Sequence, residues 1–199
     1  MGKGTRLPLA KSRDITTMPD DLIHCDICGP ISIHAYNSEI YFVTFTDDSM
    51  RYCWVFLLKN KSELLDKFII LDNYLITQLN ITIKKVHGNN ASKHEVLIGY
   101  LISKGHVWDP TPLYTPYLNP VAEIQNQHLI EPAITVLTEN QLPKYLWGHI
   151  ILDIIFIYNH LVHQKLGTSP HQALFGKTPD ASHWRALGCR CWYLIPKEC

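Results

Sequence analysis

The sequence has 199 residues, of which 46% are hydrophobic and 18% are charged. This composition excludes a chain that is disordered over most of its length, because disordered chains have few apolar residues and a large net charge. The 18 Lys and Arg residues balance the 18 Asp and Glu residues, so the formal net charge is zero. A surface that is basic all over is therefore excluded. The length fits one domain with extensions, or two small domains.

The basic residues are unevenly distributed. Residues 1–13 contain Lys3, Arg6, Lys11 and Arg13 and no acid, so the rest of the chain is mildly acidic. Residues 1–19 have no hydrophobic periodicity, which predicts an extended basic leader. Because basic side chains neutralise phosphates, these four are candidate nucleic-acid-binding residues.

The cysteine content and the apolar stretches bear on location. Six Cys are too few to replace a core, and the chain starts without a secretory leader. We therefore expect an intracellular protein, of the nucleus and cytoplasm. The longest apolar stretch, residues 146–162, is interrupted by polar residues and falls short of the roughly 18 uninterrupted apolar residues of a membrane span. A membrane is thus not an expected partner.

The first half of the chain predicts a meander of three strands and then a helix. Residues 22–27, 40–45 and 52–57 are rich in apolar, aromatic and β-branched residues, with turn residues between them. From Lys61 to Leu79 the apolar residues recur at helical spacing. A fourth strand is expected at 81–86, which the turn Gly88-Asn89-Asn90 would end.

The second half predicts helices with one further strand. We expect a helix at about 94–103, a strand at 105–108, helices at about 122–138 and 143–161, a short helix near 171–175 and a strand-like segment at 189–195. Pro132 should kink or split the first long helix, because a mid-helix proline removes a hydrogen bond. This order predicts a mixed α/β sheet with helices on its faces, an order shared by the ribonuclease-H-like fold. The expected division is a core domain over 20–165 and an extension over 166–199.

Three polar positions lie where such sheets place reactive side chains. Asp26 lies in the first strand, Asn89 follows the fourth, and Glu123 begins the first long helix. Carboxylates at these places could hold a pair of Mg²⁺ ions for phosphoryl transfer. Taken alone, they also fit a solvated strand residue, a turn residue and a first-turn acid favoured by the helix dipole.

Several segments, in order along almost the whole chain, resemble the integrase core of copia-type (Pseudoviridae) long-terminal-repeat retrotransposon Pol polyproteins. They are DICGP (26–30), YFVTFTDD (41–48), RYCWVF (51–56), LYTP (113–116), NPVAE (119–123), LPKYLW (142–147), the stretch 168–180 and LGC (187–189). Residues 2–8 resemble the stretch that follows the zinc-binding module in this family. The resemblance therefore implies a core that begins after that module and is truncated.

The resemblance implies a fold, an activity and partners. The fold is the ribonuclease-H-like one of the retroviral integrase superfamily, and the family joins a DNA 3′ end to target DNA with an Asp, Asp, Glu triad and Mg²⁺ or Mn²⁺. The triad positions match Asp26, Asn89 and Glu123, so the middle acid is an amide here. Asp26 and Glu123 are the implied metal ligands. DNA and a second copy of the chain are the implied partners, and no small-molecule substrate is expected.

The departures from the family pattern predict a degenerate and inactive core, which holds little or no metal. An amide at position 89 removes a full negative charge from a site for two divalent cations. Pro120 replaces a flexible glycine, and Ile124, Gln125 and Gln127 replace basic residues that face DNA. Only Asn126 resembles the pattern there, so it is a candidate DNA contact. The alternatives are a non-enzymatic nucleic-acid-binding or protein-interaction remnant, and a chain that does not fold stably.

Other clusters have simpler interpretations. Cys25, Cys28, Cys189 and Cys191 could form a four-thiolate zinc site if they met in space, but buried or idle thiols are favoured.

Two histidine pairs also stand out. His160 and His163 have a spacing that could offer two metal ligands on one helix face, although a polar helix end is favoured. His87 and His94 flank position 89, which allows the hypothesis that they rescue a metal site.

Overall fold

The computed structural model describes residues 21–89, 95–111 and 120–190, and at positions 89, 120, 122 and 123 it describes the backbone alone. Within these ranges, the strands form one mixed sheet in the order β3-β2-β1-β4-β5. The β1–β2 and β2–β3 pairs are antiparallel, and the β1–β4 and β4–β5 pairs are parallel. The strands are β1 (Leu22–Cys28), β2 (Tyr41–Asp47), β3 (Cys53–Leu58), β4 (Lys85–Asn89) and β5 (Val107–Thr111).

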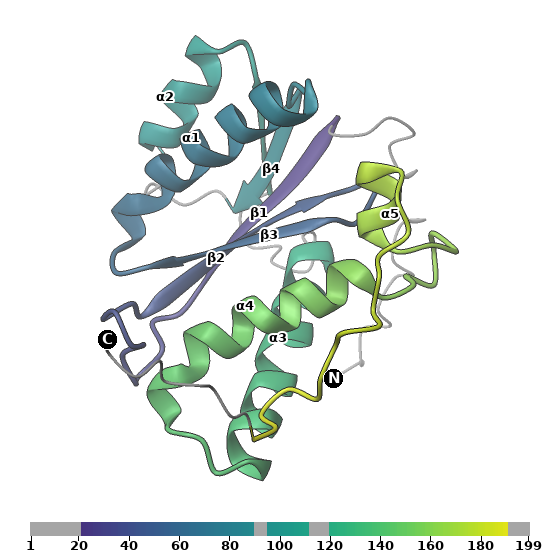
Figure 1. Ribbon diagram of the computed structural model, residues 1–199. Helices are drawn as coiled ribbons and strands as arrows, with labels where there is room; N and C mark the ends of the chain where they lie inside the picture. The colour runs from purple at the N-terminus through teal and green to yellow at the C-terminus, as the bar shows by residue number, and fades with distance from the viewer. Residues whose placement is uncertain (1–20, 90–94, 112–119, 191–199) are drawn as a thin grey trace, which may run out of the picture.

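Helices cover both faces of this sheet (Figure 1). Helices α1 (Leu64–Tyr74) and α2 (Glu95–Ser103) lie on one face, and α3 (Pro120–Glu139) and α4 (Trp147–His160) lie on the other. The short helix α5 (Pro170–Phe175) contacts α4, and the Ser169 hydroxyl caps it by accepting a hydrogen bond from the Gln172 backbone N–H. The predicted mixed α/β sheet with flanking helices is confirmed.

Strand alternation assigns side chains to the two helical layers. In β1, Ile23 and Cys25 join the apolar core under α1 and α2, whereas His24 and Asp26 point to the α3 side. The first core is centred on buried aromatic and aliphatic side chains such as Phe45. A second core under α3 and α4 includes Phe42, Leu129, Ala133, Trp147, Ile151 and Ile155.

The last two strands differ from the prediction. Strand β4 spans Lys85–Asn89, so Gly88 and Asn89 belong to a strand and not to the expected turn. The reason is tertiary: β4 pairs on both sides, and a Cβ on Gly88 would lie 2.6 Å from the Trp108 ring of β5. Strand β5 includes Pro110, which an edge strand tolerates because its free side needs no N–H donor.

The helix that contains Pro132 is not split. Helix α3 continues through Pro132 from Pro120 to Glu139. Leu129 and Ala133 are buried against the core on either side of this turn, while Pro132 itself is exposed. Water can therefore reach the His128 carbonyl that loses its N–H donor. The expected split is wrong because packing holds the helix together.

Two other segments differ in detail from the prediction. The helix expected over 61–79 is a 3-10 turn over Lys61–Glu63, helix α1, and a π turn over Leu75–Leu79. In the strand-like segment expected at 189–195, Cys189 and Arg190 are not in a strand, and the remainder lies outside the described residues. Among the described helices, none is long and apolar enough to span a bilayer.

Candidate active site

The parallel pairing of β1 and β4 places two of the predicted site positions side by side. The register pairs Cys25 with Gly88, so the next residues, Asp26 and Asn89, lie beside each other at the carboxyl ends of the two strands. On its other side Asn89 pairs with Thr111 of β5. The backbone thus brings positions 26 and 89 together although they are far apart in the sequence.

A hydrogen-bonded unit ties helix α3 to the sheet at this point. The Asn126 amide donates from Nδ2 to the Asp26 carboxylate at 2.7 Å. The Thr44 hydroxyl lies 3.3 Å from Asn126 Oδ1 and 3.4 Å from the Asp26 carbonyl, and it can donate to either. Asn126 is only 8% exposed and Thr44 is fully buried. This unit fixes the height and rotation of α3 over β1.

The start of α3 completes the same edge of the sheet. Glu123 lies in the first turn of α3, one helical turn before Asn126. Residues three apart on a helix share a face, so the backbone of position 123 lies on the side of α3 that carries the Asp26 contact. Asp26 and Asn89 thus follow a paired position of two neighbouring strands, and the backbone of position 123 lies one helical turn before the Asn126 contact with Asp26.

The negative charge of Asp26 helps to raise the pKa values of two neighbouring thiols, Cys25 and Cys28. Burial, and then the charge of Asp26, raise the pKa of the half-buried Cys28 thiol. The same two causes raise the pKa of the buried Cys25 thiol. Both thiols therefore keep their protons at neutral pH, which excludes them as activated nucleophiles.

The donor set fits a pair of divalent cations poorly. Positions 26, 89 and 123 offer two carboxylates and one amide, so at most two negative charges face the four positive charges of such a pair. In the part of the chain that the structure describes, no group of three or more His, Cys, Asp and Glu side chains lies close enough to hold a metal ion.

Asn126 is largely buried, and its role as a DNA contact stays a prediction. Its amide is buried between Asp26 and Thr44, whereas Ile124 and Gln127 are exposed on α3. The four basic residues Lys3, Arg6, Lys11 and Arg13 lie outside the described residues, so their role stays a prediction.

The sequence analysis missed a buried charged network next to this site. His24 Nε2 lies 3.1 Å from Asp48 Oδ1, and Arg51 forms an ion pair with the same oxygen at 3.3 Å. All three are buried, at 5%, 8% and 7% exposure. His24 and Asp26 are two residues apart on one strand face, which is the sequence signal that could have found the first member.

A second histidine joins this network from β4. His87 is fully buried; its Nδ1 lies 3.1 Å from Asp109, and its Nε2 lies 3.3 Å from the Thr111 hydroxyl. The His24 and His87 rings meet edge to face with centroids 5.5 Å apart. His87 is thus held inside the sheet layer by Asp109 and Thr111. His94, the other half of the rescue hypothesis, lies outside the described residues.

The structure also bears on the possible zinc site of the cysteines and the possible metal ligands His160 and His163. Cys25 belongs to the core under α1 and α2, whereas Cys28 packs against the opposite core, so the two cannot share one zinc ion. Cys191 lies outside the described residues. His160 stacks on His171 with centroids 4.5 Å apart, and His163 lies beyond the end of α4. These two histidines form no common metal site.

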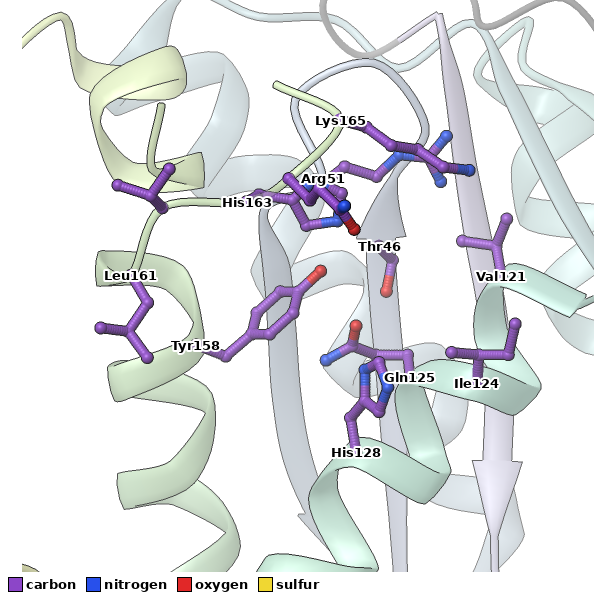
Figure 2. A pocket seen from close by; sticks show the side chains of 12 residues that line it. Thr46, Arg51, Val121, Ile124, Gln125, His128, Tyr158, Leu161, His163 and Lys165 are labelled. Carbon is purple, nitrogen blue, oxygen red and sulfur yellow. The ribbon is translucent and has the colours of Figure 1, made fainter. Parts of the chain in front are cut away.

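A cavity of about 670 Å³ lies between α3, β2 and the segment that follows α4 (Figure 2). Gln125, the residue before Asn126, lines it, and so do Thr46, Tyr158 and the basic residues Arg51 and Lys165. The sequence analysis did not predict this cavity, because its walls come from three distant segments.

Comparisons with known proteins agree with this architecture. No protein-family model matches the chain. Over 96% of its length the chain is 29% identical to the retrovirus-related Pol polyprotein from transposon RE1 and 30% identical to that from transposon RE2, both of Arabidopsis thaliana. The chain spans 13% of the length of each polyprotein.

Solved structures share the fold at lower identity. A chain of the simian T-cell lymphotropic virus intasome, in complex with the PP2A regulatory subunit B56 gamma, matches 93% of this chain with a TM-score of 0.70 and 15% identity, over 66% of its own length. The HTLV-2 integrase catalytic core domain, in complex with magnesium in a trimeric form, matches 79% of this chain with a TM-score of 0.57 and 13% identity, over 97% of its own length.

The sheet order and helical layers described above thus coincide with those of retroviral integrase catalytic cores, which confirms the ribonuclease-H-like fold. Over almost its whole length the chain is homologous to retrovirus-related Pol polyproteins of copia-type transposons, and its structural neighbours are retroviral integrase cores.

Proposed function

We propose that this chain is an integrase core that binds DNA and does not catalyse strand transfer. The observation that supports the proposal is the strand register, in which Asp26 and Asn89 directly follow the paired residues Cys25 and Gly88; the resemblance matches Asn89 to the middle acid. A site that joins DNA ends with two divalent cations depends on the charge of its carboxylates. With an amide at this position, the cations lose a full unit of compensating charge.

The remaining residues at this edge support a structural role for the site. Asp26 accepts a hydrogen bond from Asn126 in a place where α3 is anchored to the sheet. The Asp26 carboxylate therefore has a structural role in anchoring α3, whether or not it has a catalytic one. Retention of Asp26 alone is compatible with loss of catalysis.

A strand-transfer assay tests inactivity directly. The full chain is incubated with duplex DNA that carries free 3′-hydroxyl ends, together with Mg²⁺ or Mn²⁺. We expect no joined product. Joined product from the wild-type chain that disappears in the Glu123→Gln variant would contradict the proposal, because it would assign catalysis to this site.

Metal affinity tests the physical reason. Calorimetric titration with Mn²⁺ should give tighter binding to the Asn89→Asp variant than to the wild type, because the substitution restores one negative charge beside Asp26. The matched control is Asn80→Asp, which makes the same change at the left-handed residue that ends the π turn, away from the site. Equal Mn²⁺ affinity for the wild type and Asn89→Asp would show that charge at position 89 does not limit metal binding.

DNA binding is the retained part of the proposed function. Fold and homology support it, and Lys3, Arg6, Lys11 and Arg13 supply a concentrated positive charge. Fluorescence anisotropy should show that the affinity for labelled duplex DNA falls with salt. The logarithm of the association constant should fall with the logarithm of the salt concentration, with a slope of about 0.9 per phosphate contact. Deletion of residues 1–13 should lower both the affinity and this slope. Unchanged values would exclude the arm as a DNA contact.

The proposal extends to assembly and location. We propose a homo-oligomer of the nucleus and cytoplasm that binds DNA, by analogy with integrase relatives, of which one is solved in a trimeric form. Sedimentation of the full chain with and without DNA measures the oligomeric state. A monomer under both conditions would remove the oligomer from the proposal.

A further inference from the structure

The cavity beside Asn126 has walls from three parts of the chain. Gln125 of α3 and Thr46 of β2 lie at its floor, Tyr158 comes from α4, and Lys165 comes from the segment after α4. Figure 2 shows the Gln125 side chain facing Tyr158, with Arg51, His163 and Lys165 gathered at one end. The volume of about 670 Å³ is within the range of sites for small ligands, about 300–1,000 Å³.

The charged groups that line this cavity have one sign. Arg51 and Lys165 are basic, and no Asp or Glu is among the described lining residues. Burial lowers the pKa of His163, and the positive charges of Arg51, Lys165 and His128 lower it further. Arg51 also pairs with Asp48, but its guanidinium has five N–H donors and so retains others. The cavity therefore has a positive potential.

An unpartnered donor lines the same cavity. Gln125 is only 4% exposed, and its Nε2 has no hydrogen-bond partner among the described residues. A buried amide donor without a partner is costly, and most such groups in native proteins are satisfied. Burial raises the pKa of Tyr158 to about 12, so its phenol keeps its proton at neutral pH and can donate as well. Buried donors together with cations are what an anion with several oxygens requires.

Apolar side chains line two sides of the cavity, Val121 and Ile124 from the start of α3 and Leu161 from the segment after α4 (Figure 2). Apolar side chains offer a surface for the body of an organic anion but no hydrogen bonds to its charged group. A ligand that fits this lining carries a phosphate at the basic end and a flat or apolar body between the apolar side chains. Nucleotides have this chemistry.

We infer that this cavity binds a nucleotide, with its phosphate between Arg51, Lys165 and the Gln125 amide. The nucleotide is either free or the 5′-phosphorylated end of a DNA strand. The inference rests on the proposed function, because DNA is the phosphate-bearing partner proposed there, and it adds a site on the chain that does not involve the basic arm.

Calorimetric titration of the full chain tests it with three probes. They are deoxyadenosine monophosphate, a short single-stranded oligonucleotide with a 5′ phosphate, and the same oligonucleotide without that phosphate. We expect the 5′-phosphorylated strand to bind at least about tenfold more tightly than its unphosphorylated twin, the effect of one charged hydrogen-bonding group. Deoxyadenosine monophosphate that binds while both strands do not would assign the site to free nucleotides.

The variants separate this site from the arm. Gln125→Met keeps the side-chain length and removes a buried unsatisfied donor, so it should leave the melting temperature unchanged or raised while binding of the phosphorylated probe weakens. Lys165→Met should weaken it about tenfold. Lys104→Met, the same change at an exposed lysine after α2, should have no effect.

Two results distinguish failure of this inference from failure of the proposed function. If the two strands bind equally and Gln125→Met and Lys165→Met change nothing, the cavity does not hold a phosphate, although arm-dependent DNA binding can persist. The other result is that duplex DNA does not bind in the anisotropy assay, whereas deoxyadenosine monophosphate binds in the titration and Lys165→Met abolishes this binding. The proposed function then fails, and the nucleotide site in the cavity stands.

Discussion

The two faces of the sheet contrast sharply. Under α1 and α2 the sheet is covered by a nearly continuous apolar core, in which Asp72 with its partners Tyr100 and His106 is the main polar group among the described residues. Under α3 and α4 only the half next to β2 and β3 is apolar. The other half, next to β1, β4 and β5, carries histidines, acids and threonines in hydrogen-bonded contact.

This contrast separates stability from the candidate site. Burial of apolar area is the main stabilising term of a domain. The α1–α2 face supplies such burial and carries no described residue of the candidate site. The α3 face places polar groups where strands end, and each needs a partner because burial of an unpaired polar group is costly. Substitutions on the two faces should therefore fail for different reasons.

The largest effect is expected from the apolar face. Phe68 is fully buried and its ring meets those of Phe45 and Tyr100 at centroid distances of 5.7 and 6.1 Å. Phe68→Ala should lower the free energy of unfolding by about 3–5 kcal/mol through lost burial and a cavity. Chemical denaturation measures this, with exposed Ile70 of the same helix as the control. An equal loss in Ile70→Ala would deny that Phe68 is central to this core.

The next effect comes from the charged network on the other face. Asp48→Ala removes the partner of both Arg51 and His24 and leaves buried charge behind. The free energy of unfolding should fall by about 3 kcal/mol. Asp66→Ala, at an exposed acid in α1, should cost less than about 1 kcal/mol. If the two variants are equally stable, the network contributes nothing to folding.

A smaller effect is expected where α3 is anchored. Thr44→Val removes the hydroxyl next to Asn126 and Asp26 and should destabilise the fold by about 1 kcal/mol. The same substitution at exposed Thr135 of α3 should change stability by less than about 0.5 kcal/mol. Loss of hydrogen-exchange protection in α3, specific to Thr44→Val, would sharpen the assignment of an anchor, and unchanged protection would argue against it.

The smallest effect concerns pH on the apolar face. Burial and the Asp72 carboxylate, to which Tyr100 donates a hydrogen bond at 2.9 Å, raise the pKa of Tyr100 from 10.0 to about 12. Because the folded pKa lies above the unfolded one, this contribution to stability is complete below pH 10 and is lost as pH rises through about 12. Urea denaturation at pH 9 and pH 11 should show a smaller loss for Tyr100→Phe than for the wild type. Equal losses would exclude Tyr100 as the titrating group.

Much of the fold could be predicted from pattern, and the errors have physical causes. The meander of β1, β2 and β3 and the long helices follow from alternation and helical periodicity. The position of β4 was wrong because a Gly-Asn pair resembles a turn, whereas Trp108 packs on Gly88 and two neighbouring strands hold it extended. Of the kink or split expected at Pro132, the split was wrong because Leu129 and Ala133 are buried against the core while the proline itself is open to water.

The candidate site was predictable only in part. Asp26, Asn89 and Glu123 were identified through resemblance, and their roles stay predictions. Asn126 was identified only as a candidate DNA contact and not as the partner of Asp26, and His24 was not identified, because their contacts join residues far apart in the chain.

By itself, the sequence determined which strands and helices form and which family the chain resembles, because periodicity and short motifs are local properties. Its zero net charge also stood as evidence against a wholly basic surface. Only the tertiary structure decided that Asn89 lies beside Asp26, that α3 is anchored through Asn126, and that Arg51 and Lys165 share a cavity. These facts depend on strand register and helix docking, which are set by contacts between distant segments and leave no periodic trace in the chain.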